Sequence, residues 1–301
     1  MKTIQLLLLL SIALFSCQSA TEPESTPETA VLFSEGVISS ELPEFATTIN
    51  AAGTTLYFNR TTADRSSMQI MRSDLTNGEW STPEALPFST GEYLEVDPFL
   101  THDGQRLYFS STRPLMEGDS AKDFDTWYIE KQGDSWSAPI NPGTPLNSDT
   151  TEIFITIAKS GNAYFLSERF GGRDVVVSRF QNGNYQEPEP LNLRLNGDSI
   201  YYSNPCIASD ESFIIVCADA PEEPRNGDLY ISYNNNGQWS GLQRLGPIVN
   251  STYTEFAPGL SKDDKVLYFT SERPGIVPAQ EEGMRPPGDI YRVEMNSVES
   301  R

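Results

Sequence analysis

Acidic side chains recur at one position of the sequence pattern, and they are the residues best suited to chemistry in this chain. Glu44, Glu95, Glu152 and Glu255 each begin a run rich in apolar and β-branched residues, and Asp97 follows Glu95 by two positions. Carboxylates that converge near one point repel one another, and a hard cation such as Ca²⁺ would relieve that repulsion. Two carboxylates at a set separation would instead suit the acid and nucleophile of a glycosidase.

A third interpretation of the same carboxylates needs no ligand. Arg113, Arg169 and Arg273 recur five residues after a tyrosine in three of the similar stretches. An arginine that reaches a buried carboxylate forms a strong ion pair, and such a pair would join adjacent structural units. The sequence leaves the cation site and the structural pairs open.

Other catalytic and ligand-binding patterns are weak. His102 is the single histidine and falls in an expected hairpin turn, so a Ser-His-Asp or Cys-His mechanism has no base. No Cys/His cluster has zinc spacing, and Gly171-Gly172 indicates a tight turn rather than a phosphate loop. The net charge of −21 disfavours nucleic acid as a partner, because the surface would repel phosphate.

An internal repeat positions these carboxylates. The central residue of the second expected strand is Tyr57, Tyr108, Tyr164, Ile215 or Tyr268, at spacings of 51 to 56 residues. Each unit contains a first strand, a tight turn, a second strand, a variable loop, a third strand and a short fourth strand. Asp103-Gly104 between two apolar runs is a strong hairpin signal. Four antiparallel strands in a unit of this size are typical of a β-propeller blade.

The number of repeat units predicts an all-β fold, namely a five-bladed propeller over residues 30–301. The fifth unit stops after its third strand, in "DIYRVEMNSVESR". The N-terminal "TAVLFSEGVISSELPEF" aligns with the segment around the fourth strand of unit one. We therefore expect the N-terminal segment to complete the last blade and close the ring, which removes an exposed sheet edge.

Two stretches carry a family resemblance. "LTHDGQRLYFSSTRP" and "LSKDDKVLYFTSERPG", followed by "GDIY", resemble the WD40-like repeats of the TolB type. The similarity extends over most of residues 30–301 and is strongest in units two and five. It implies a propeller of bacterial envelope proteins, usually without catalysis.

The N-terminus resembles a lipoprotein signal peptide. Residues 1–17 contain a positive start at Lys2, an apolar run and the sequence Leu14-Phe15-Ser16-Cys17, which is similar to a lipobox. The resemblance implies cleavage before Cys17, its lipidation and anchoring in the cell envelope, with the outer membrane favoured by Gln18. Residues 18–29 are then expected to form a flexible acidic tether.

Propeller topology groups the variable loops on one face, together with the glutamate that begins each innermost strand. The longest of these loops, residues 113–125 and 273–289, combine charges with apolar side chains, namely Leu115, Met116, Ile276 and Met284. Loops that vary on a rigid scaffold are frequent binding sites. We expect this face to bind an envelope or secreted protein, or a glycan.

Two further sets of residues are assigned by their place in the blade. Cys206 and Cys217 flank a hairpin and are expected nearly opposite one another, either as a disulfide or as two buried thiols. Trp80, Trp136 and Trp239 recur at one blade position, where unit three has Tyr185, and are expected to pack between blades.

The sequence thus predicts a non-catalytic, lipid-anchored binding propeller. A five-bladed-propeller glycosidase that uses the axial carboxylates is the alternative. The acidic position is shared by four units, whereas a glycosidase needs carboxylates that differ between blades.

Overall fold

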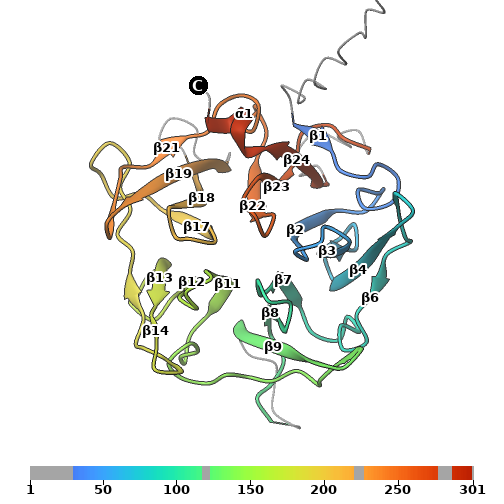
Figure 1. Ribbon diagram of the computed structural model, residues 1–301, viewed down its shortest axis with the longest axis horizontal. Coiled ribbons are helices and arrows are strands. Elements are labelled where there is room, and N and C mark those ends of the chain that lie inside the picture. The colour runs from blue at the N-terminus through green and yellow to red at the C-terminus, as the bar shows by residue number, and fades with distance from the viewer. Residues whose placement is uncertain (1–29, 117–122, 220–226, 277–286, 300–301) are drawn as a thin grey trace, which may run out of the picture.

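The computed structural model describes residues 30–116, 123–219, 227–276 and 287–299, and it shows a closed ring of five blades (Figure 1). Strands β2, β7, β11, β17 and β22 surround the centre of the ring, and consecutive strands of each blade lie progressively further out. Each blade is an antiparallel sheet with four strand positions, so the predicted fold class is confirmed. Residues 1–29, which include the expected signal peptide, Cys17 and the tether, lie outside the described residues.

The first two blades follow the predicted strand order. Blade 1 contains β2 (Glu44–Ile49), β3 (Thr55–Thr61), β4 (Met68–Thr76), β5 (Glu79–Trp80) and β6 (Glu84–Ala85). Blade 2 contains β7 (Glu95–Leu100), β8 (Arg106–Ser111), β9 (Asp125–Gln132) and β10 (Ser135–Trp136).

The remaining blades repeat this order. Blade 3 contains β11 (Glu152–Ile157), β12 (Ala163–Ser167), β13 (Asp174–Ser178), the hairpin of β14 (Phe180–Gln181) and β15 (Asn184–Tyr185), and β16 (Glu189–Pro190). Blade 4 contains β17 (Tyr202–Ile207), β18 (Phe213–Asp219), β19 (Gly227–Asn235), β20 (Gln238–Trp239) and β21 (Gln243–Arg244). Blade 5 contains β22 (Glu255–Leu260), β23 (Val266–Ser271) and β24 (Asp289–Glu294), and helix α1 (Met295–Glu299) follows.

The N-terminal strand closes the ring as predicted. Strand β1 (Val31–Leu32) pairs antiparallel with β24, with Val31 opposite Arg292 and Leu32 opposite Tyr291. Phe33 continues the contact, because its N–H donates to the carbonyl of Ile290 at 2.8 Å. Blade 5 therefore combines the two ends of the described chain.

Aromatic side chains join neighbouring blades, and the predicted role of the tryptophans is confirmed. Trp136 of blade 2 contacts Tyr57 of blade 1, with ring centroids 6.4 Å apart. Trp239 of blade 4 contacts Tyr164 of blade 3 in the same edge-to-face way at 6.5 Å. These two tryptophans thus cover the second-strand tyrosine of the preceding blade, a geometry that adds to the burial of apolar area. In blade 1, Trp80 contacts Phe33, which in turn contacts Tyr268 of blade 5.

All five innermost strands contain a β-bulge that the sequence analysis did not predict. The pairing register shifts at this point in each blade. The bulged residues all have positive φ, and they are Ala46, Asp97, Phe154, Asn204 and Ala257. A bulge leaves one backbone group of its strand unpaired, so proline is tolerated there. Proline does follow the bulged residue in three blades, at Pro98, Pro205 and Pro258.

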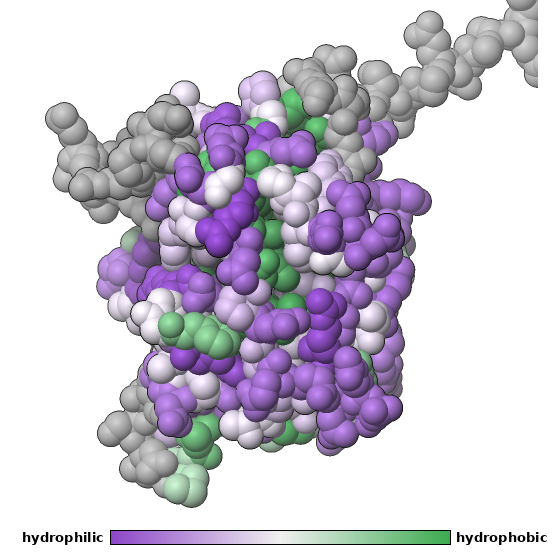
Figure 2. Space-filling model, turned by 90° about the vertical axis from the view of Figure 1, so that its left-hand side faces the viewer, coloured by the Kyte–Doolittle hydropathy of each residue, from purple (hydrophilic) through white to green (hydrophobic). Residues whose placement is uncertain are grey.

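The outside of the ring is largely polar. Figure 2 shows the side formed by blades 3 and 4, where hydrophilic residues predominate and apolar groups appear in small separate areas. This surface agrees with the excess of 42 acidic over 21 basic residues.

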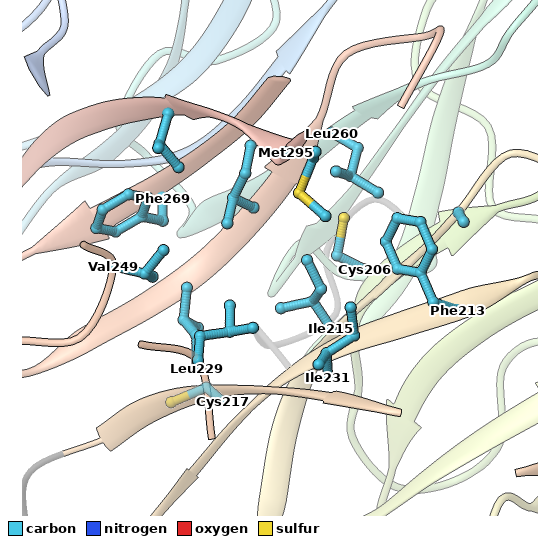
Figure 3. Close-up of a cluster of buried hydrophobic side chains, with 14 of the residues drawn as sticks. Cys206, Phe213, Ile215, Cys217, Leu229, Ile231, Val249, Leu260, Phe269 and Met295 are labelled. Atoms are coloured by element: carbon cyan, nitrogen blue, oxygen red, sulfur yellow. The ribbon is translucent and has the colours of Figure 1, made fainter. Parts of the chain in front are cut away.

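The two cysteines of blade 4 are buried and form no disulfide (Figure 3). The bulge in β17 places Cys206 opposite Ile215 and Cys217 opposite Ser203, so the expectation that the cysteines lie nearly opposite one another was wrong. Both side chains belong to the apolar cluster between blades 4 and 5, where burial raises the pKa of Cys206 to about 12. The alternative of two buried thiols is the one that the structure shows.

We therefore expect both thiols to be unreactive in the folded protein. In a chain that begins at residue 30, a thiol reagent such as DTNB should label neither Cys206 nor Cys217 until denaturant is added, because burial blocks access and suppresses the thiolate. Two equivalents should then react. Rapid labelling of the native protein would contradict this packing.

Candidate functional site

An apolar depression of about 210 Å³ lies at the mouth of the propeller axis, and we call it the axial depression. Its apolar lining comes from four blades and the connection before β9, and includes Phe45, Met68, Val96, Phe124, Ile153 and Phe256. Phe45, Ile153 and Phe256 also pack on a small cluster of Ala46, Phe154 and Ala257, three of the bulged residues. The bulges thus place side chains across the axis beneath the depression.

The axial depression lies on the face that the sequence analysis singled out. Phe124 stands at the end of the 113–125 loop, and Gly288 near the end of the 273–289 loop, and both line it. Arg65, from the connection between β3 and β4, is another lining residue. The described ends of the two predicted binding loops therefore meet at one hollow.

The four shared glutamates are not available to a ligand in this structure. Glu44, Glu152 and Glu255 are 0% exposed and Glu95 is 1% exposed. Each forms an ion pair with an arginine, and these pairs are Glu44 with Arg60 at 2.7 Å, Glu152 with Arg169 at 3.2 Å, Glu255 with Arg273 at 3.1 Å, and Glu95 with Arg113. The structural interpretation of the arginines is confirmed.

The pairs lie within a blade, so the prediction that they join adjacent blades was wrong. Antiparallel pairing puts Glu152, at the start of β11, opposite Ser167, at the end of β12. Arg169 follows Ser167 by two residues and therefore folds back over the glutamate of its own blade. Arg169 also donates to the carbonyls of Pro145 at 2.8 Å and Leu146 at 2.7 Å, which fixes the connection that enters the blade.

Two elements of this arrangement were missed from the sequence. Arg60 serves blade 1 but follows Tyr57 by three residues instead of five, so the spacing concealed it. A serine four residues before the glutamate also binds it: Ser148 donates its backbone N–H and its hydroxyl to Glu152, at 2.7 Å each. Ser40 and Ser251 do the same for Glu44 and Glu255, a Ser-x-x-x-Glu signal that is readable in the sequence.

The described part of the chain contains no cluster of side chains that would support the hypothesis of a calcium ring. No group of three or more His, Cys, Asp or Glu residues there is placed to hold a metal ion. The arginines already supply the positive charge that Ca²⁺ would bring to the glutamates.

We expect calcium to leave the stability unchanged. The melting temperature in millimolar Ca²⁺ should match that in EDTA, measured by circular dichroism on the chain from residue 30, because the carboxylates are already neutralised by arginine. An increase of several degrees with Ca²⁺, but not with Mg²⁺, would contradict the ion-pair interpretation.

Asp97 differs from the four glutamates because it lines the axial depression without an ionic partner among the described residues. It occupies the bulge of β7 with φ 57°, a conformation that aspartate tolerates better than most residues. Its backbone N–H donates to Asn59 Oδ1 of blade 1 at 2.7 Å. Among the described residues, no hydrogen bond or ion pair reaches its carboxylate, and desolvation raises the pKa of Asp97 to about 7.

This burial gives Asp97→Asn a defined pH signature. The folded pKa lies above the unfolded value of 3.8, so the carboxyl destabilises the fold increasingly as pH rises from 4 through 7. The variant should equal the parent near pH 4 and be more stable at pH 8, by on the order of 1–4 kcal/mol. Urea unfolding at both pH values measures this, and an equal difference at both would contradict it.

The opposite end of the axis is closed by Lys262, another residue that the sequence analysis missed. Its Nζ donates to Thr48 Oγ1 at 3.3 Å and to the Leu100 carbonyl at 2.5 Å. It also lies 4.3 Å from the centroid of the Phe99 ring. Desolvation lowers the pKa of Lys262 to about 8. The cavity left along the axis is only about 20 Å³, so the axial depression is a blind hollow.

The predicted apolar loop residues are only partly brought to this site. Leu115 and Met116 are 50% and 69% exposed, and neither lines the axial depression. Ile276 is partly buried, and its N–H donates to Asp289 at 3.2 Å. Met284 lies outside the described residues.

Comparison with known proteins places the chain in the five-bladed β-propeller class. No family model and no curated protein sequence matches it. An α-L-arabinofuranosidase from Lactobacillus brevis is similar in structure, with a TM-score of 0.55 and 11% identity over 87% of this chain and 93% of that one.

Two other similar structures represent different functions. A GH43 endo-arabinanase from Bacillus licheniformis has a TM-score of 0.49 and 14% identity, over 83% of this chain and 93% of that one. TolB from Acinetobacter baumannii has a TM-score of 0.47 and 15% identity, over 85% of this chain and 55% of that one. At 11% identity, the likeness to the arabinofuranosidase shows the fold alone and leaves the activity to the site itself.

No described helix is long and apolar enough to cross a bilayer.

Proposed function

We propose that this chain is a non-catalytic, lipid-anchored binding propeller of the cell envelope, which holds a partner protein or glycan at the axial depression. The observation that carries the proposal is the state of the axial carboxylates. The four glutamates are buried in ion pairs, and Asp97 is the one of these five acidic residues that faces the hollow without an ionic partner among the described residues. A glycosidase needs two such groups.

The chemistry of the axial depression suits a small, largely apolar group. Its volume of about 210 Å³ is below the usual range for drug-sized ligands, so it matches one side chain of a partner or one sugar ring. Phe45, Phe124 and Phe256 provide aromatic contacts around it. A hydroxyl or amine on the incoming group would satisfy the Asp97 carboxyl, which has no other hydrogen-bond partner in the described structure.

Attachment to the envelope rests on residues 1–29. A diacylated Cys17 and a tether over 18–29 would hold the propeller near the membrane, with the outer membrane favoured. Two acyl chains suffice for stable anchoring.

Glycoside hydrolysis remains the second candidate because one observation favours it. A carboxyl with a pKa of about 7 at the axis matches the protonation state of a general acid near neutral pH. The other acidic residue that lines the axial depression is Glu44, and it accepts bonds from Arg60 and Ser40.

Two matched variants test the binding proposal. Phe124→Ala removes a phenyl ring from the axial depression, and Phe180→Ala removes an exposed one from the opposite face. A partner recovered from solubilised envelopes by the lipidated protein should be lost with Phe124→Ala and retained with Phe180→Ala. Equal recovery by both variants would contradict this site.

An activity screen addresses the second candidate. The chain from residue 30 should not hydrolyse a panel of aryl glycosides. Turnover that disappears in Asp97→Asn, while Glu255→Gln only lowers stability, would overturn the non-catalytic proposal in favour of a propeller glycosidase.

A further inference from the structure

A second and larger cavity, of about 540 Å³, lies between blades 2 and 3 on the face opposite the axial depression. We call it the turn-face cleft. Its walls are the first hairpin turns of the two blades, the end of β9 and the β14–β15 hairpin. The sequence analysis treated this face as turns alone.

One wall of the turn-face cleft is aromatic. Phe180 is 40% exposed, and its ring lies 5.0 Å from that of Tyr185. Gly161 permits this position, because a Cβ atom there would lie 2.8 Å from Phe180 Cδ1. The phenyl ring is therefore held between two elements while part of it remains open to the cleft. Such a surface packs well against the C–H face of a sugar ring.

The rim of the turn-face cleft carries two lysines, and one of them, Lys159, interacts at longer range with the carboxylates of Asp210 and Asp264. Lys131 and Lys159 are exposed, and neither forms an ion pair within the described ranges. Arg106 is neutralised by Glu130 at 2.6 Å. Asp103 is the remaining acidic residue of the lining, and it accepts bonds from Thr101 at 2.6 Å and Gln105 at 3.0 Å.

These two lysines contrast with the rest of the chain. Acidic residues outnumber basic ones by 42 to 21, so a concave site with two exposed lysines departs from the general surface. Lys131 is also oriented, because its Nζ lies 5.0 Å from the centroid of the Trp136 ring. Charges of one sign around a concave site raise the local concentration of the oppositely charged ligand.

His102 lies beside the two lysines in the lining of the cleft. His102 Nδ1 is buried and has no hydrogen-bond partner among the described residues. Burial, Lys262 and Lys159 lower the pKa of His102 to about 4, so its ring is neutral at pH 7. The His102 ring therefore adds no positive charge to the cleft, and its covered Nδ1 is not a ligand contact in this structure.

We propose that the turn-face cleft binds a carboxylated sugar ring, with the ring against Phe180 and the carboxylate at Lys131 and Lys159. These three side chains line one cavity, and neither lysine forms an ion pair among the described residues. The site is separate from the axial depression, and the inference does not rest on the function proposed there.

D-glucuronate is the probe that tests this inference, in calorimetric titrations of the chain from residue 30. D-glucose has the ring without the carboxylate, and acetate has the carboxylate without the ring. Glucuronate should bind at least about tenfold more tightly than either, because it alone makes both contacts. Its affinity should fall as salt concentration rises.

Variants locate the binding. Lys159→Gln and Phe180→Ala should each weaken glucuronate binding about tenfold. Lys159→Gln should leave the melting temperature unchanged because its side chain is exposed, whereas Phe180→Ala should lower it somewhat because the ring also packs on Tyr185. Lys265→Gln is the matched control, since this exposed lysine already pairs with Asp263 at 3.1 Å and should not affect binding.

Three results would overturn the inference: no saturable binding of glucuronate, equal binding of glucose or acetate, or an equal loss with Lys265→Gln. Phe124→Ala should leave glucuronate binding intact. The two proposed sites can therefore fail independently.

Discussion

A chain that begins at residue 35 instead of residue 30 should lose most of the stability of the propeller. The truncation removes β1 and Phe33, so the edge of β24 loses its partner strand. Phe33 is 5% exposed and lies 5.3 Å from the Tyr268 ring and 5.8 Å from the Trp80 ring. We expect a strongly lowered melting temperature and association through the exposed edge, measured by calorimetry and size-exclusion chromatography.

Phe33→Ala separates burial from strand pairing in this experiment. Loss of the side chain alone should cost about 3–5 kcal/mol, with the ring still closed and the protein monomeric. The chain that begins at residue 30 is the reference for both variants. If the shorter chain melts at the same temperature as the reference, closure by β1 does not stabilise the ring.

Arg169→Met should destabilise the protein by about 3–5 kcal/mol, because it leaves Glu152 buried and unpaired. The substitution also removes donors from the carbonyls of Pro145 and Leu146. Urea unfolding of the variant and of the parent chain measures this loss.

The controls for this substitution come from the same blade. Arg173→Met breaks the exposed pair with Glu168 at 2.7 Å and should cost less than about 1 kcal/mol. Adding Glu152→Gln to Arg169→Met should restore part of the lost stability, since the unpaired charge is gone. Equal losses for Arg169→Met and Arg173→Met would contradict the role of the buried pair.

The blade repeat was predictable because it rests on local signals. Alternating apolar residues, Asp-Gly turns and a regular spacing all indicate four-stranded units, and the unpaired fifth unit indicates where the ring closes. The positions of the tryptophans followed from the same repeat, since a residue at one blade position meets the same neighbour in each interface.

The candidate site was less predictable because it depends on contacts between distant segments. The spacing of Arg60 differs from that of the other arginines, and only the structure shows that it reaches Glu44. Lys262 lies in a turn sequence typical of solvent-exposed residues, yet it is 8% exposed at the axis. The bulges had a partial signal in Pro98, Pro205 and Pro258, but Phe154 has positive φ without any local preference for it.

The bulges also change the meaning of the Asp97-Pro98 pair. Read alone, it resembles the start of a catalytic strand, and in the fold it occupies the bulge found in every blade. This bulge differs from the others in its side chain, because it has an aspartate where the other bulges have Ala, Phe or Asn.

The seam at β1 has a mechanical consequence. Any pull on the N-terminal end of the propeller enters the ring through β1, whose pairing to β24 spans two residues. The adjoining strands β23 and β24 are paired over six residues, so they resist the same load better. Force directed along the N-terminal segment would therefore open the ring at its joint while the other four blades remain intact.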